Sequence, residues 1–560
     1  MSAHYKWYPS EAEVIVPWNA RYSFPSQANK AVKMTPRIPP KNGGTFNPGQ
    51  VIRLEFPAQG YVNPNNTTLS FDATLVYGYA VDADTTSQVR FQNNIQSLFS
   101  RVRLMYGATP LEDIIGYGQI VRSLTEWAGN APDGVITQSS IHEGIGSYVN
   151  GVSGLINGAN PTGAARSSRV QGLVNVRQAM IQGVSTIYSV ATGVYPDPPN
   201  GQGFGVVPAG TIPNVPAAPA SAPYITTANP VRRYQVQFAL GLFNQEKLIP
   251  TKFMASQLAI EITLANAAEC IFIQPNSYVT SASYQISNVN LIPEILEFDA
   301  SYDEMFLKGL MDRGVPIKFS TWNNYKFGVS GGTANLQIQE RSRSVKSIFA
   351  LQRRDPPTFG TDTGASFFNT ATNVTDGLIS LQEYQYRIGG RYFPAAPVQN
   401  ATTVGGNTSN GGAESWIELQ KALNYVGDNR LAVPCNVLKW AVNATVNSPT
   451  NSFAGATLLM EYDYNYMYVG MRNGSMYATG ISSTVNALSG NVGSSCFVMA
   501  IDLETSNGGE ISGLNAEEQS DISLIARWSA AQNTSFVFDV YTYIDSMIVL
   551  KENNVIELIQ

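Results

Sequence analysis

Two distant stretches of this chain follow the same alternating pattern. Apolar side chains occupy every second position from Leu258 to Leu264, and again from Ile522 to Trp528. This alternation is what a strand requires when one of its faces is buried and the other is not. Each stretch follows an earlier strand and a loop, and in the first copy, residues 234–264, a short helix lies between the strands. The repetition predicts two similar β-domains fused in tandem, which is more typical of a building block than of an enzyme.

The composition indicates extensive contact with other protein. The chain has 560 residues, enough for two to four domains, and 44% of them are hydrophobic, but only 14% are charged. An ordinary soluble protein has about 25% charged residues. Because Asn, Thr, Ser, Gly and Gln replace the charges, we expect much of the surface to pack against other subunits. The net charge of -6 argues against a dedicated nucleic-acid-binding protein.

The first 45 residues have a different character. Up to residue 41, six basic side chains face only two acidic ones, which gives a local net charge of +4. The basic residues are Lys6, Arg21, Lys30, Lys33, Arg37 and Lys41, and six prolines accompany them. Proline disfavours helix, so an extended basic arm over residues 1–45 is predicted. It is interpreted either as a solvated tail or as an arm beneath an assembly, near phosphate groups.

Targeting signals and cysteine pairs are not evident. Residues 1–18 lack the continuous apolar core of a secretion signal, and no run of 18 apolar residues occurs. The three cysteines, Cys270, Cys435 and Cys496, are scattered without a CxxC pair. Buried thiols in a reducing compartment are the expectation.

The chain divides into two β-rich parts. The first β-domain is predicted over residues 46–300, with a protruding insertion at 130–230, and the second over residues 315–560. A linker helix is expected at 301–314 between them. Other helices are predicted from Thr109 to Trp127, near 170–183 and at 414–424; the first of these has Thr as N-cap and Pro at its first position. The pattern predicts an all-β protein of two antiparallel sandwiches with helices confined to loops.

Residues that carry chemistry are scarce. The only histidines are His4 and His142, which removes most triads and zinc sites, and the glycines 201, 203 and 205 lack a strand-to-helix context. Glu461 and Asp463 lie on one predicted strand among Tyr462, Tyr464, Tyr466 and Tyr468, but two acids on an outward strand face are far more often solvated than catalytic. Asp82 and Asp84 lack the remaining ligands of a calcium loop, so a turn is preferred. We therefore predict no catalytic, cofactor-binding or metal-binding residue, and no cofactor.

On these features the chain resembles the double jelly-roll major capsid proteins of virophages and polinton-like DNA viruses. The resemblance covers roughly residues 45–555. It rests on the two tandem halves and on these segments: Pro110–Trp127, Leu240–Phe243, Leu248–Pro250, Leu258–Leu264, Ser512–Asn515, Asp521–Trp528 and Asp545–Leu550.

The resemblance implies two eight-stranded jelly-roll sandwiches and a structural role. It implies a homotrimer that forms a pseudo-hexagonal capsomer and tiles an icosahedral shell around double-stranded DNA, sometimes over an internal membrane. Residues 130–230 would face outward, and the basic arm would face inward, towards a membrane or the genome. Because exposed long loops carry recognition, we also hypothesise that the insertion binds a host receptor. Penton and minor capsid proteins are implied partners. The implied location is the virion capsid, assembled inside the host cell in a cytoplasmic viral factory.

A rival interpretation is a β-sandwich glycan-binding protein, such as a viral fibre or adhesin. It would use Tyr462–Tyr468 and the neighbouring acids to hold sugars. The duplicated halves and the missing secretion signal favour the capsid interpretation.

Overall fold

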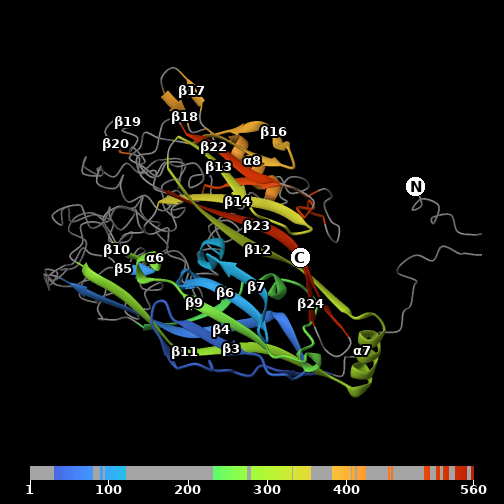
Figure 1. Cartoon of the computed structure of the whole chain (residues 1–560). Coiled ribbons are helices and arrows are strands. Elements are labelled where there is room, and N and C mark those ends of the chain that lie inside the picture. Colours follow the sequence, from blue (N-terminus) through green and yellow to red (C-terminus); the bar gives the residue numbers. More distant parts are fainter. Residues whose placement is uncertain are drawn as a thin grey trace, which may run out of the picture.

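The chain forms two β-sandwiches that follow one another in sequence (Figure 1). The computed structural model describes residues 31–79, 89–91, 95–121, 231–273, 279–330, 332–354, 381–400, 402–404, 407–409, 413–423, 452–453, 456–457, 497–504, 512–517, 521–528, 536–551 and 556–560. Two of its large antiparallel sheets come from residues 31–298 and two from residues 315–559.

The first half contains a five-stranded and a four-stranded sheet. The first has the order β1-β11-β4-β8 with β2 also on β11, and the second has the order β3-β9-β6-β7. The strands are β1 (Ala31–Met34), β2 (Thr45–Phe46), β3 (Val51–Glu55), β4 (Tyr61–Tyr79), β6 (Phe99–Tyr106), β7 (Thr109–Ile115), β8 (Val231–Gln237), β9 (Leu258–Leu264) and β11 (Val279–Phe298). Smaller elements are β5 (Val89–Phe91) paired with β10 (Ile271–Ile273), the 3-10 turns η3 (Ile95–Leu98), η7 (Gly241–Phe243) and η8 (Thr251–Phe253), and α6 (Ala267–Cys270).

The second half repeats this architecture. One sheet has the order β12-β23-β14-β21 with β24 on β23, and the other has the order β13-β22-β15-β16. The strands are β12 (Val315–Val329), β13 (Thr333–Ile338), β14 (Val345–Arg354), β15 (Leu381–Ile388), β16 (Arg391–Gln399), β21 (Met499–Asp502), β22 (Ile522–Trp528), β23 (Phe536–Leu550) and β24 (Ile556–Ile559). Two hairpins, β17 (Thr402–Val404) with β18 (Asn407–Ser409) and β19 (Ser452–Phe453) with β20 (Ala456–Thr457), and α8 (Ala413–Ala422) lie between β16 and β21 in sequence.

The strand order in both halves is that of a jelly-roll. When the eight principal strands of each half are numbered in chain order, with β1 and β2 counted together, one sheet reads 1-8-3-6 and the other 2-7-4-5. Two sheets of this kind form a closed pair of Greek keys. The predicted all-β fold with two tandem jelly-roll sandwiches is therefore confirmed.

The two halves match residue by residue along their seventh and fourth strands. β9 and β22 have seven residues each, so Leu258 corresponds to Ile522 and Leu264 to Trp528. A register shift occurs between Phe99 and Arg101 of β6, and the same shift occurs at the corresponding place of β15. A bulge increases the local twist of a strand, so the shared bulge gives β6 and β15 a similar local twist. The predicted alternation in both copies is confirmed.

The helix predicted from Thr109 to Trp127 is wrong over its first half. Residues 109–115 form β7, which pairs with β6, and helical structure begins only at residue 117. The Thr-Pro pair belongs to a tight hairpin through Gly107, which has φ 58°, and Pro110 is tolerated because β7 is an edge strand. The part of this predicted helix after residue 121 lies outside the described residues.

Two other helices form as predicted. α7 (Ala300–Arg313) lies between the halves in sequence; the carboxylate of Asp299 accepts the amide proton of Ala300 at its start, and Gly314 with φ 73° follows its end. α8 covers the predicted 414–424 region. The helix predicted near 170–183 and the insertion 130–230 lie outside the described residues, in the connection between β7 and β8. The domain boundaries at 46–300, 301–314 and 315–560 stay a prediction.

Part of the predicted N-terminal arm lies on the first sandwich. Residues 31–34 pair with β11 as strand β1, and Lys33 forms an ion pair with Glu294. Lys41 forms a 2.8 Å ion pair with Glu55. The described part of the arm is therefore extended, with both lysines beside carboxylates.

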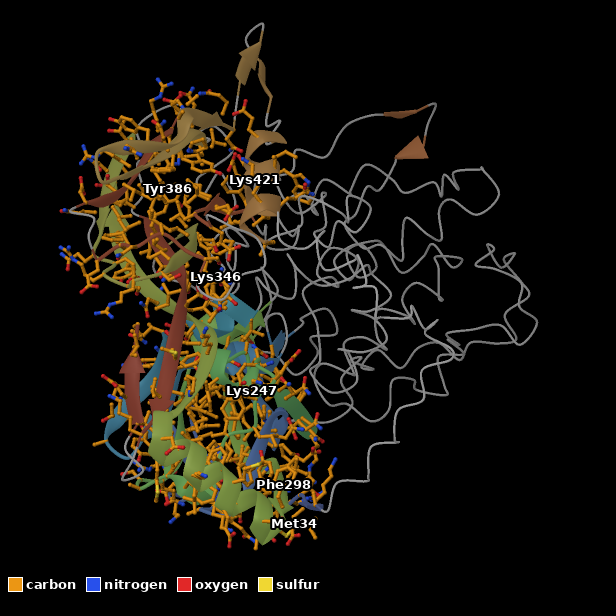
Figure 2. All side chains as sticks on the ribbon, turned by 90° about the vertical axis from the view of Figure 1, so that its right-hand side faces the viewer. Met34, Lys247, Phe298, Lys346, Tyr386 and Lys421 are labelled. Atoms are coloured by element: carbon orange, nitrogen blue, oxygen red, sulfur yellow. The ribbon has the colours of Figure 1, made fainter. Side chains whose placement is uncertain are left out.

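One continuous apolar core runs through both halves. It includes Leu54 and Ile260 of the first half and Ile348 and Leu524 of the second. Figure 2 shows side chains filling both sandwiches, with Met34 and Phe298 at one end of the molecule and Tyr386 towards the other. Because the core continues across the junction, the two halves are packed against each other and are not independent domains joined by a flexible linker.

Candidate functional site: the junction between the two jelly-rolls

A buried carboxylate joins the two halves. Glu112 on β7 is 2% exposed and accepts three hydrogen bonds of 2.8 Å. Two come from the backbone N–H groups of Gly241 and Leu242 in η7, and the third comes from the hydroxyl of Thr321 on β12. One side chain therefore ties a strand and a turn of the first jelly-roll to the first strand of the second.

Burial controls the charge of this carboxylate. Desolvation raises the pKa of Glu112 above its ordinary value, while the three donors act in the opposite direction. All three donors are neutral groups. The carboxylate therefore depends on oriented dipoles, and the loss of any one donor leaves a buried acceptor less well satisfied.

The approach at the junction requires glycine. A Cβ atom on Gly241 would lie 1.9 Å from the carbonyl oxygen of Ser320 on β12, well inside any allowed contact. Gly116, directly after β7, has φ +68°, and a Cβ atom there would lie 2.3 Å from the hydroxyl oxygen of Tyr541. Tyr541 donates a 3.3 Å hydrogen bond to the carbonyl oxygen of Gly116. Two glycines thus permit backbone of the first half to touch the second.

A second contact attaches α7 to the first half, and it is aromatic. The ring of Tyr61 on β4 lies against four other rings with centroid separations between 5.2 and 5.9 Å. These rings belong to Phe253, Phe298, Tyr302 and Phe306. Leu310 of α7 and Leu550 of β23 pack in the same cluster, so α7 is attached to both sandwiches.

The hydroxyl of Tyr61 fixes the position of α7. It donates a 3.0 Å hydrogen bond to Asp303, whose other oxygen pairs with Lys252 at 2.5 Å. The hydrogen bond from Lys252 lowers the pKa of Asp303, and burial raises the pKa of Tyr61. Both groups therefore keep the protonation states that this contact requires at neutral pH.

Asp545 organises the segment 512–515, on which part of the resemblance rests. Its carboxylate accepts hydrogen bonds from the hydroxyls of Ser320 (3.0 Å) and Ser344 (2.8 Å). The hydroxyl of Ser344 also accepts the amide proton of Gly513, at 2.9 Å, and a Cβ atom on Gly513 would lie 2.5 Å from the carbonyl carbon of Val345. The Ser-Gly pair therefore allows this loop to lie directly on β14.

Glu340 is a second buried carboxylate, with more donors than Glu112. It accepts from the backbone and hydroxyl of Ser342, the hydroxyl of Thr542, the amide of Asn323 and the hydroxyl of Tyr325. Burial alone would raise its pKa, but these hydrogen bonds outweigh burial and the pKa lies below the ordinary value. This carboxylate is therefore ionised in the folded protein at neutral pH and stabilises it.

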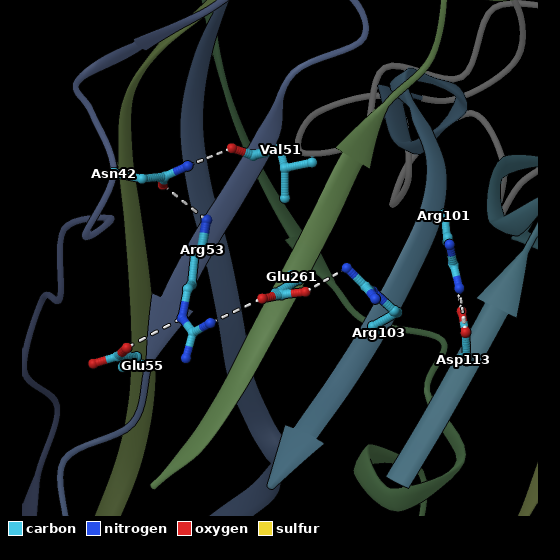
Figure 3. Close-up of polar contacts among 8 residues, drawn as sticks. All are labelled: Asn42, Val51, Arg53, Glu55, Arg101, Arg103, Asp113 and Glu261. Atoms are coloured by element: carbon cyan, nitrogen blue, oxygen red, sulfur yellow. Dashed lines mark hydrogen bonds and ion pairs between the residues drawn. The ribbon is translucent and has the colours of Figure 1, made fainter. Parts of the chain in front are cut away.

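Ion pairs cross the outer face of the sheet β3-β9-β6-β7 (Figure 3). Arg53 contacts Glu55 at 3.2 Å and Glu261 at 3.0 Å, and Glu261 also contacts Arg103 at 2.6 Å. Arg101 pairs with Asp113 on β7. Arg101 and Arg103 thus face outward, as the alternation of their strand predicts. The corresponding face of the second half pairs Arg527 with Glu383 at 2.8 Å.

The residues that sequence analysis weighed for chemistry are not among those that the structure describes. His4, His142, Asp82, Asp84, the glycines 201, 203 and 205, and residues 461–468 all lie outside the described residues. In the part of the chain that the structure describes, no three His, Cys, Asp or Glu side chains are grouped to hold a metal ion. Among the described helices, none combines the length and apolar composition of a membrane-crossing segment. Cys270 is buried with a free thiol, whereas Cys435 and Cys496 are not described.

Sequence reasoning missed Glu112. The helix predicted from Thr109 would place Glu112 in its first turn, where an acid is favoured, whereas Glu112 is a buried strand residue. The segment Leu240–Phe243, which contains its donor Gly241, contributes to the resemblance, but its sequence does not indicate this role. Only the tertiary arrangement joins the two.

The arrangement described so far defines a class: a tandem pair of jelly-rolls with a glycine-dependent, buried junction. No family model matches the chain, and no curated protein matches it. A chain in the structure of the Sputnik virophage is 10% identical, with 98% of this chain and 92% of that chain covered and a TM-score of 0.50. This likeness shows the same fold along nearly the whole chain.

Two further solved structures are similar over their length. The mavirus major capsid protein is 10% identical to this chain; the match covers 100% of this chain and 94% of that protein, with a TM-score of 0.43. The Faustovirus major capsid protein is 9% identical, covers 96% and 93%, and has a TM-score of 0.46.

Proposed function

We propose that this chain is a major capsid protein, a structural subunit without catalytic activity. Three copies form a pseudo-hexagonal capsomer, and capsomers tile an icosahedral shell around a double-stranded DNA genome. The observation that carries the proposal is the pair of jelly-rolls fixed to one another through Glu112, Gly241 and Thr321. Three copies of the chain contain six similar jelly-rolls, and these approximate a hexagon only if the two jelly-rolls of each copy keep a constant angle. A rigid junction provides that angle.

The low charge content supports the same function. Only 14% of residues are charged, and the charges on the outer face of the first sandwich neutralise one another in cross-strand pairs. A face of this kind can be covered by another subunit with little uncompensated charge. Many modest contacts repeated by symmetry then stabilise a shell.

The domain plan of the proposal follows the sequence. Residues 46–300 and 315–560 form the two jelly-rolls, joined by a linker helix at 301–314. Residues 130–230 form an outward insertion that binds a host receptor, and residues 1–45 form a basic arm on the inner side, where a membrane or the genome lies. Penton and minor capsid proteins are further partners. Virions are assembled in the cytoplasmic viral factory of the host cell, a virophage or polinton-like virus being the source.

The glycan-binding alternative receives no support from the described residues. Its sugar-binding wall, Tyr462–Tyr468, lies outside them. Jelly-rolls occur in lectins as well as capsids, but the tandem pair and its buried junction suit a shell subunit better.

The mass of the purified protein tests the proposal. Light scattering is expected to give three times 60.7 kDa, and electron microscopy of the same fraction a hexagonal outline. A stable monomer with saturable glycan binding would overturn the capsid proposal. Deletion of residues 130–230 is expected to leave the trimer intact and abolish host attachment.

A further inference from the structure

The edge strands β3 and β13 occupy the same position in the two halves. Each is the outer strand beside the seventh strand of its sheet. The amide of Leu264 donates a 2.9 Å hydrogen bond to the carbonyl of Gln50, and the amide of Trp528 does the same to Gly332. The registers are uninterrupted, so Val51 corresponds to Thr333 and the match continues through both strands.

The edge of β3 is covered by the chain itself. Backbone groups of alternate residues point away from the sheet, and in β3 these belong to Val51, Arg53 and Glu55. The side-chain amide of Asn42 donates to the carbonyl of Val51 at 2.5 Å and accepts the amide proton of Arg53 at 3.0 Å (Figure 3). The amide of Lys41 donates to the carbonyl of Arg53 at 2.9 Å. Residues 41–42 therefore take the place of a neighbouring strand.

The edge of β13 has no such cover within the described residues. The same alternation directs the backbone groups of Thr333, Asn335 and Gln337 away from β22. None of them has a backbone partner on that side among the residues that the structure places. Only residues 330–332 join β12 to β13, whereas residues 35–50 lie between β1 and β3. Three residues are too few to fold back along the edge.

β13 also lacks the usual protection of an edge strand. The corresponding outer strands at the opposite sheet edges contain proline, Pro110 in β7 and both Pro394 and Pro397 in β16. β13 reads Thr-Ala-Asn-Leu-Gln-Ile, with neither proline nor charge. Such an edge accepts an extended peptide through main-chain hydrogen bonds.

We propose that the N-terminal segment of a neighbouring copy, residues 1–30, binds along β13 as an added strand. This inference rests on the proposed self-association. Residues 1–30 contain the proline-free stretch Ser10–Val16, which ends in Val-Ile-Val, a composition favourable to strands. In the first half, residues 41–42 of the same chain cover the edge of β3. In the proposed arrangement, the N-terminal segment of a neighbouring copy covers the equivalent edge of β13 in the second half.

The position of β1 favours a neighbouring copy over the same chain. Ala31 pairs opposite Phe298. Phe298 lies at one end of the molecule, and Tyr386, in the sheet that contains β13, lies towards the other (Figure 2). The segment before Ala31 therefore starts at the end of the molecule opposite this sheet, and thirty extended residues reach at most about 100 Å.

Photo-crosslinking of the assembled full-length chain tests the proposal. Gln337, whose side chain is exposed, is replaced by benzoylphenylalanine, and products are mapped by mass spectrometry. We expect crosslinks between copies that end within residues 1–30. Crosslinks within one chain, crosslinks that end outside residues 1–30, or none at all would overturn the proposal.

Two variants at one position supply the control. Asn335→Pro removes the amide proton that points away from the sheet, at an edge position that tolerates proline. Asn335→Ala keeps that proton. The crosslink is expected to persist in Asn335→Ala and to fall at least tenfold in Asn335→Pro. Hydrogen exchange at the amides of Thr333, Asn335 and Gln337 is expected to rise at least tenfold when residues 1–30 are deleted, a measurement that does not depend on either variant; unchanged exchange contradicts the proposal.

Light scattering separates failure of this inference from failure of the proposed function. Trimers without the crosslink would overturn the exchange of N-terminal segments and leave the capsid proposal standing. Monomers under all conditions would overturn both.

Discussion

The hydroxyl of Thr321 in the second jelly-roll donates a 2.8 Å hydrogen bond to the buried carboxylate of Glu112 in the first. The same carboxylate receives the two backbone amides of η7. Its position therefore couples local folding of the first half to docking of the second. Stability of the pair and the angle between the jelly-rolls depend on the same side chain.

Glu112→Gln tests this coupling. The amide must turn its NH₂ group towards a donor, which leaves a buried N–H unsatisfied, so we expect a loss of about 1–3 kcal/mol in the free energy of unfolding. Asp113→Asn is the matched control, since Asp113 is partly exposed on the same strand and pairs with Arg101. Its effect is expected to stay below about 1 kcal/mol. Urea unfolding measures both, and equal losses would contradict the special role of Glu112.

Features set by local periodicity could be predicted from the sequence. The alternation in β9 and β22 fixes which face is buried, and the structure places Leu258 and Ile522 at the same register position. α7 was predictable because capping residues and an acidic first turn act locally.

The junction could not be predicted, because it depends on contacts between residues far apart in the chain. Thr109-Pro110 is a good helix start in isolation, but pairing with β6 and burial of Leu111 and Ile114 outweigh that local preference. Similarly, the sequence around Gly241 does not indicate that the carbonyl oxygen of Ser320 lies beside this glycine and excludes a side chain from it.

Gly241→Ala is expected to disrupt the junction. Its Cβ atom would overlap the carbonyl oxygen of Ser320, a backbone atom that cannot turn aside, so β12 must shift away from η7. We expect a loss of at least about 3 kcal/mol, or failure of the two halves to dock. Thermal unfolding followed by tryptophan fluorescence measures this loss.

Gly309→Ala is the control, because this glycine has room for a side chain. Gly309 lies within α7, and a Cβ atom there would meet nothing within 4 Å. Alanine favours helix over glycine, so this change is expected to stabilise the protein by up to about 1 kcal/mol. Two glycine-to-alanine changes with the same sign would indicate that space at Gly241 does not control docking.

Asn42→Ala is expected to uncover the edge of β3. The change removes both side-chain hydrogen bonds to Val51 and Arg53 and keeps the backbone bond from Lys41. Hydrogen exchange at the amide of Arg53 should accelerate, with a loss of about 1 kcal/mol in stability. Asn288→Ala, which removes an exposed asparagine from β11, is the comparison, and no change in exchange at Arg53 is expected there. Identical exchange at Arg53 in all three proteins would show that Asn42 does not protect the edge.

Acid titration should distinguish the two buried carboxylates. The pKa of Glu340 lies below its ordinary value, because its hydrogen bonds outweigh burial. Its contribution is therefore present above the unfolded-state pKa and is lost as pH falls through the lower folded-state value. The cost of Glu340→Gln, measured by urea unfolding, is expected to be largest at neutral pH and to shrink towards pH 3.

Glu112 should show the opposite slope. Burial raises the pKa of Glu112 above its ordinary value, which the unfolded chain keeps. As pH rises, the unfolded chain therefore releases the proton first, and the contribution of Glu112 falls until the pH passes the folded-state pKa. The cost of Glu112→Gln is therefore expected to be larger near pH 4 than at pH 7. Parallel slopes in the two series would mean that the neutral donors around Glu112 stabilise its charge as well as the larger set around Glu340 does. That outcome would give the junction the same acid sensitivity as the second jelly-roll.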